Sequence, residues 1–82
     1  KMMARCIALD RDCADIGALT ARFLARGSEH APHLLRECAE ICRACGQECE
    51  QHAAHAEHCR QCAEACRRCE QACMQAAGAA AR

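Results

Sequence analysis

Cysteines recur along this chain at the spacing of one helix face, and that spacing constrains the fold more than any other feature. The stretch CRQCAEACRRCEQAC, residues 59–73, places five cysteines three or four residues apart. Residues at these steps lie on one side of an α-helix, on the face that other helices fill with leucine. The thiols therefore occupy the surface that has to pack against the rest of the fold.

The same periodicity predicts an all-α fold of three long helices, at about residues 2–26, 32–52 and 56–76. In the first, a stripe with steps of three and four runs from Cys6 to Phe23, and Gly27 ends the helix. Pro32 suits the first turn of the second helix. The cysteine register then slips before Cys59, which indicates a hairpin turn within HAAHAEH. We expect residues 1–82 to form one antiparallel helical bundle of the four-helix-bundle type with a cysteine-lined interior.

Composition leaves the second half of the chain without a conventional core. From Arg36 onward the large apolar side chains are Ile41 and Met74 alone, in a chain of only 82 residues. A bundle this small needs another source of stability.

Basic and acidic residues balance at 11 each, so nothing indicates a nucleic acid or an anionic membrane as partner. No apolar stretch approaches the roughly 18 residues that a membrane span needs.

Two cysteine runs, CAEICRACGQEC at 38–49 and CRQCAEACRRC at 59–69, share the pattern CAExCRxC. Each CxxxC or CxxC pair places two sulfurs on one helix face, within reach of one ion. Structural zinc usually takes four ligands from short hooks on turns, and iron–sulfur sites have their own loop spacing. A continuous file of thiols instead favours cuprous copper, a soft ion that accepts two or three sulfurs and shares them.

Other interpretations stay open. Cysteine can serve as a small apolar core residue, although nine of them between residues 38 and 73 argue against that reading. Disulfides within one helix rarely meet the required geometry, and 11 cysteines is an odd count. The alternatives to copper are another thiophilic metal such as zinc, or a thiol-redox or disulfide-stapled helical scaffold. No catalytic triad, paired-carboxylate site or phosphate loop indicates an enzyme.

The antiparallel arrangement sorts residue types between the two ends of the bundle. Aliphatic side chains such as Ile16, Leu19 and Leu34 collect at one end and are expected to form a plug. The opposite end collects soft and intermediate metal ligands beside Cys6. We expect metal ions to enter there through the following residues: Met2, Met3, His52, His55 and His58.

The cysteine ladder and the stretch HAAHAEHCRQCAEACRRC, residues 52–69, resemble the bacterial copper storage proteins, a family of cysteine-rich four-helix-bundle copper-binding proteins. The resemblance covers essentially the whole chain. It implies storage of many cuprous ions inside the bundle and assembly into homo-oligomers. Residue by residue, it assigns copper ligation to Cys6, Cys13, Cys38, Cys42, Cys45, Cys49, Cys59, Cys62, Cys66, Cys69 and Cys73.

The chain departs from that family in two places. The family's first cysteine-bearing helix has no counterpart, so we expect that an N-terminal helix is missing and that the bundle has an open side, as in a fragment or a chain closed by a second copy. Gly17 stands where a CxxxC partner of Cys13 is expected. Because free thiols persist in the cytoplasm, we expect that compartment, with any sequence before Lys1 left open.

Overall fold

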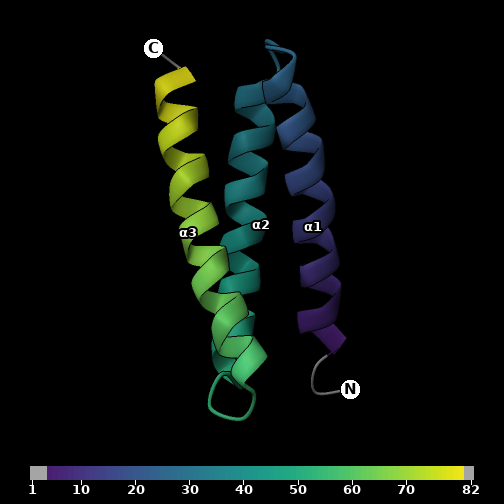
Figure 1. Ribbon diagram of the computed structural model, residues 1–82, viewed down its shortest axis with the longest axis vertical. Helices are drawn as coiled ribbons and strands as arrows, with labels where there is room; N and C mark the ends of the chain where they lie inside the picture. Colours follow the sequence, from purple (N-terminus) through teal and green to yellow (C-terminus); the bar gives the residue numbers. More distant parts are fainter. Residues whose placement is uncertain (1–3, 81–82) are drawn as a thin grey trace.

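A computed structural model describes residues 4–80 of the chain. Three helices follow one another: α1 (Ala4–Ala25), α2 (Ala31–His52) and α3 (Glu57–Ala80), with no strand in this range. They run alternately up and down along an elongated body of 41 × 18 × 15 Å (Figure 1). The prediction of an all-α antiparallel bundle is confirmed, and α3 continues past its expected end near residue 76 because its last turns consist almost entirely of alanine, the best helix former.

The middle helix, α2, is the element that both other helices pack against (Figure 1). The backbones of α1 and α3 do not come within 8 Å of each other at their Cα atoms over the described residues. Side chains alone bridge the space between these two helices. The positions of α1 and α3 are therefore set separately, each by its own contact with α2.

Glycine ends α1 as expected. Gly27 has a φ of 64°, its N–H donates to the carbonyl of Leu24 (3.1 Å), and the N–H of Ser28 donates to that of Phe23 (3.0 Å). This pair of bonds is the Schellman arrangement, in which a left-handed residue satisfies the last carbonyls of a helix. The Arg26 guanidinium covers the Phe23 ring at 4.2 Å. The chain then enters α2 with Pro32 in its first turn.

The second turn, residues 53–56, reverses the chain without glycine or proline. The carbonyl of His52 accepts from the N–H groups of both His55 (3.0 Å) and Ala56 (3.1 Å). The N–H of Ala53 donates to the carbonyl of Glu50 (3.2 Å), so the turn itself supplies donors for two of the last carbonyls of α2. This turn places the C-terminal end of α2 beside the N-terminal end of α3.

Thiols replace aliphatic side chains in the core. The largest fully buried side chains are cysteines, and Leu35 is the one large aliphatic residue that is buried among the described residues. The aliphatic end of the bundle is less closed than predicted, because Leu24 is 48% exposed. A groove of about 290 Å³ also lies there, with Gly17, Leu24 and Leu35 on one side and Ala72 and Ala76 of α3 on the other. Alanines at these α3 positions are too small to fill the space.

Two of the three glycines inside the helices, Gly17 and Gly46, have different surroundings. A Cβ atom at Gly46 would lie 3.4 Å from the Cβ of Cys66 and 3.8 Å from the carbonyl oxygen of Ala63, so α2 and α3 are in close contact here. A Cβ atom at Gly17 would meet no atom within 4 Å. Gly46 thus has a packing role, and Gly17 has none within the described residues.

This difference predicts opposite effects of enlarging the two glycines. Gly17→Ala should raise the free energy of unfolding of the reduced, metal-free protein by about 1 kcal/mol, because alanine lowers the cost of the helical backbone. Gly46→Leu should lower it by about 1–3 kcal/mol, because the longer side chain must displace Cys66 or Ala63. Urea unfolding followed by circular dichroism measures both. Destabilisation by Gly17→Ala would contradict the open surroundings of that residue.

Candidate metal centre

All eleven cysteines are free thiols; eight are buried and three, Cys13, Cys62 and Cys69, are half-buried. Two come from α1, four from α2 and five from α3. They face the interior because their three- and four-residue steps follow the helical repeat. The structure thus brings every cysteine singled out in the sequence into one continuous interior file.

Thiols of α2 and α3 face one another in pairs along the bundle. The pairs are Cys49 with Cys62, Cys45 with Cys66, Cys42 with Cys69, and Cys38 with Cys73. Each step forward along α2 is matched by an equal step back along α3. The mirrored spacing of the two runs, four-three-four in both directions, is what allows these eight thiols to pair across an antiparallel interface.

Helix α1 adds thiols along one edge of this ladder. The Sγ atoms of Cys6 and Cys49 lie 3.3 Å apart, and those of Cys13 and Cys42 lie 3.4 Å apart. Cys6 also lies close enough to Cys59 to raise the pKa of that thiol, although burial of Cys59 contributes more. Sulfurs from all three helices are therefore in direct contact.

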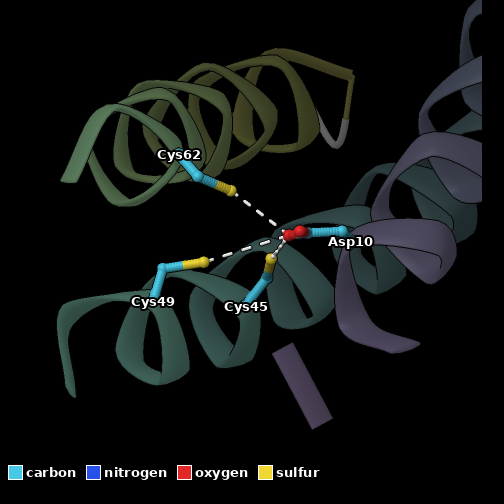
Figure 2. Close-up of side chains that lie close together, drawn as sticks. All are labelled: Asp10, Cys45, Cys49 and Cys62. Atoms are coloured by element: carbon cyan, nitrogen blue, oxygen red, sulfur yellow. Dashed lines mark hydrogen bonds between the residues drawn. The ribbon is translucent and has the colours of Figure 1, made fainter. Parts of the chain in front are cut away.

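Three groups of side chains bring their ligand atoms within 4.8 Å of one another, close enough to hold an ion. Two contain thiols only: Cys13, Cys45 and Cys66 form one, and Cys38, Cys69 and Cys73 form the other. The third joins Asp10 to Cys45, Cys49 and Cys62 (Figure 2). Cys45 belongs to two groups, so an ion in one would share a sulfur with an ion in the other.

Asp10 is the ligand-type residue that the sequence analysis missed. Its Oδ1 atom accepts hydrogen bonds from the thiols of Cys45 (3.0 Å), Cys62 (3.2 Å) and Cys49 (3.9 Å), as Figure 2 shows. The signal was present, because Asp10 lies four residues after Cys6 and three before Cys13. It therefore shares their face of α1, where a carboxylate is easily taken for a surface residue.

Burial raises the pKa of several interior thiols and so keeps them protonated. It raises the pKa of Cys62 to about 11 and that of Cys73 to about 12. Burial raises the pKa values of Cys42, Cys45 and Cys49 still further, and hydrogen bonds to neighbouring groups add to the effect. Because the thiolate is the form that binds metal, an ion has to displace these protons as it binds.

The C-terminal end of α2 carries a buried polar cluster beside Cys49. Glu48 and His52 are both only 8% exposed. The Oε1 atom of Glu48 accepts from Arg5 (2.7 Å), and its Oε2 atom lies 3.2 Å from Nε2 of His52. The hydrogen bond from Arg5, followed by that from His52, lowers the pKa of Glu48. One nitrogen of the His52 ring is thereby held in place by a carboxylate.

The other residues expected at this end are placed differently. His55 and His58 are exposed, and Nε2 of His58 lies 3.6 Å from the Sγ of Cys59. Met2 and Met3 lie outside the described residues. An exposed imidazole thus adjoins a buried thiol at the start of α3.

Across residues 4–80, no helix combines the length and the hydropathy that crossing a lipid bilayer would require.

The raised pKa values predict that alkali destabilises the metal-free protein. An unfolded thiol titrates near 9.0, whereas the folded state keeps Cys62 protonated to about 11 and Cys73 to about 12. Above pH 9 the unfolded chain binds fewer protons than the native state, so the free energy of unfolding is greatest below that pH and falls as the pH rises toward 11 and 12. We expect the melting temperature of reduced protein, followed by circular dichroism, to fall over this range. A rise would contradict a protonated thiol interior.

A curated protein and a family model resemble the chain. The Bacillus subtilis (strain 168) protein described as "Uncharacterized cysteine-rich protein YhjQ" is 42% identical over 57 residues, which are 70% of this chain and 51% of the relative. The chain therefore spans about half the length of that curated relative. No solved structure gives a significant match. The family model described as "Csp: Copper storage protein" matches residues 1–78, and the chain accordingly belongs to the copper storage protein family.

Proposed function

We propose that this protein stores several cuprous ions on the thiols of its interior, and that it does so without catalytic turnover. The observation that carries the proposal is the pair of thiol-only groups, one of which shares Cys45 with the group that contains Asp10. Three sulfurs at one point match the coordination number of a soft monovalent ion. A sulfur that belongs to two groups suits bridging between neighbouring ions.

The energetics support the idea that the binding of cuprous ions makes the bundle rigid. The metal-free interior consists largely of cysteines and alanines, which bury little apolar area, and a groove remains open between α1 and α3. Each ion that replaces thiol protons would join sulfurs from different helices, so its binding energy would add to the stability of the fold. Such an arrangement suits storage, because the ions are part of the core.

Other functions fit the geometry less well. Zinc prefers a closed set of four ligands, whereas two of the three groups found in the described residues offer three thiols and no fourth ligand atom. A disulfide-stapled scaffold would pair the thiols covalently, but all eleven are free. Free thiols persist in reducing compartments, so we also infer that the protein acts in the cytoplasm.

Titration with cuprous ion tests the proposal. Reduced protein should be titrated anaerobically against a competing chelator, and uptake should exceed one ion per four cysteines because neighbouring ions share sulfurs. Cys45→Ser should remove more bound cuprous ions than Cys59→Ser, since Cys45 lies in a thiol-only group and Cys59, which is similarly buried, lies in no group. Saturation near one ion per four cysteines would instead indicate zinc-like sites, and absence of tight uptake would indicate a scaffold.

We further propose that copper enters at the end marked by His52, His55 and His58. The support is the 3.6 Å approach of Nε2 of exposed His58 to the Sγ of Cys59. From Cys59 an ion would pass to Cys6 and then to Cys49. The Sγ atoms of Cys6 and Cys49 are 3.3 Å apart. Exchange between adjacent sulfurs would carry the ion inward without its release into water.

Replacing the three histidines tests this path. The variant His52→Ala/His55→Ala/His58→Ala should take up cuprous ion more slowly while keeping nearly the full capacity, because the interior thiols are unchanged. Stopped-flow mixing with a cuprous chelate measures the rate. The matched control is His30→Ala/His33→Ala at the other end of the bundle, which should leave the rate unaltered. Equal rates for both variants would contradict entry through His52, His55 and His58.

A further inference from the structure

One of the three ligand groups differs chemically from the others. The group of Asp10, Cys45, Cys49 and Cys62 has four ligand atoms, one of them a carboxylate oxygen, whereas the other two have three sulfurs each. Asp10 reaches this group from α1, the two cysteines at 45 and 49 come from α2, and Cys62 comes from α3 (Figure 2). All three helices therefore converge on this one site.

Binding of a cuprous ion does not account for the presence of a carboxylate among the ligand atoms. Soft monovalent copper selects thiolate and thioether ligands, and carboxylate oxygen suits harder ions. Zn²⁺ accepts both ligand types and prefers four of them in a tetrahedron. The composition of this group therefore matches a divalent ion of intermediate character better than it matches the ion that the thiol-only groups suit.

The distances are compatible with such an ion. Tetrahedral bonds of about 2.3 Å to sulfur and about 2.0 Å to oxygen hold the ligand atoms roughly 3.5–3.8 Å apart. The Oδ1 atom of Asp10 lies 3.0, 3.2 and 3.9 Å from the three sulfurs, and all four ligand atoms lie within 4.8 Å of one another. Small side-chain rotations would suffice to close the set.

The charge around Asp10 points the same way. Other acidic residues of the described chain, such as Glu40 and Glu48, pair with arginines, but none of its ion pairs includes Asp10. Its oxygen instead accepts hydrogen bonds from three thiols. Asp12 and Asp15 on the same helix are exposed to solvent. Asp10 is thus the carboxylate of α1 that lies among the thiols, where a bound cation would neutralise it.

We propose that Asp10, Cys45, Cys49 and Cys62 form a four-ligand site that binds one divalent ion such as Zn²⁺, separate in specificity from cuprous storage in the thiol-only groups. The ion would displace the three thiol protons to solvent and join the three helices at one point. Because Cys45 also belongs to the neighbouring thiol-only group, the two kinds of ion would compete for its sulfur.

Co²⁺ provides a visible probe for this site. The reduced chain of 82 residues, titrated anaerobically with Co²⁺ alone, should bind one ion per chain with the intense visible bands of tetrahedral cobalt and with sulfur-to-cobalt charge transfer in the near ultraviolet. Asp10→Asn and Asp10→Ala should weaken this binding by roughly tenfold or more, since even outer-shell partners of metal ligands contribute 10–100-fold. Asp15→Ala is the matched control and should bind as the parent does.

A rescue variant separates a ligand from a merely structural residue. Asp10→Cys offers a fourth sulfur in place of the oxygen and should restore binding with stronger charge transfer, whereas a structural role for the carboxylate would not be restored. Circular dichroism of each variant checks that the helices persist, and Asp10→Asn keeps the shape of the side chain. Equal Co²⁺ binding by the parent, Asp10→Asn and Asp10→Ala would overturn the proposal.

Cuprous titration keeps this test apart from the storage proposal. Asp10→Asn should retain the cuprous capacity of the parent, because the eleven thiols remain. A parent protein that takes up cuprous ion but shows no tetrahedral cobalt would overturn the divalent site alone. Cobalt binding that depends on Asp10, in a protein that takes up no cuprous ion, would support the divalent site and overturn storage.

Discussion

The antiparallel pairing of thiols between α2 and α3 is the interaction on which the rest of the structure depends. Cysteine is small, so the two helices approach closely, and Gly46 allows them to touch at Cys66. Because thiols bury little apolar area, this interface supplies less hydrophobic stabilisation than a leucine seam would. The bundle therefore combines close packing with weak cohesion, and its stability is open to change by whatever binds the sulfurs.

Helix α1 has a different relation to this interface. It contacts α2 through Cys6 and Cys13 and is attached near its start by the ion pair of Arg5 with buried Glu48. It reaches α3 through the side chain of Asp10. The consequence is that α1 covers one edge of the thiol file while leaving a groove beside Gly17, which Cys38, Cys69 and Cys73 also line.

The sequence was sufficient to predict the three helices, both turns and the face that carries the thiols, because each of these follows from local periodicity and from signals such as Gly27 and Pro32. It did not reveal which thiol of α2 meets which thiol of α3, since that depends on how many residues the turn at 53–56 uses. Asp10 was overlooked because an acidic residue beside apolar ones is normally solvated, and only the tertiary fold shows three thiols around it. The open groove was missed for a similar reason. The apolar pattern of α1 and α2 does not show the distance between α1 and α3, or that the small side chains of Ala72 and Ala76 leave this space unfilled.

The mirrored spacing of the two cysteine runs has a consequence for alignment. Steps of four, three and four residues are not uniform, so sliding α3 along α2 by one turn would leave at least two of the four α2 thiols opposite alanine, glutamate or histidine in place of sulfur. Bulky side chains that ordinarily fix the alignment of packed helices are nearly absent from this interface. The order of short and long steps thus encodes a single alignment, and ions that require sulfur from both helices would select that alignment from all the others.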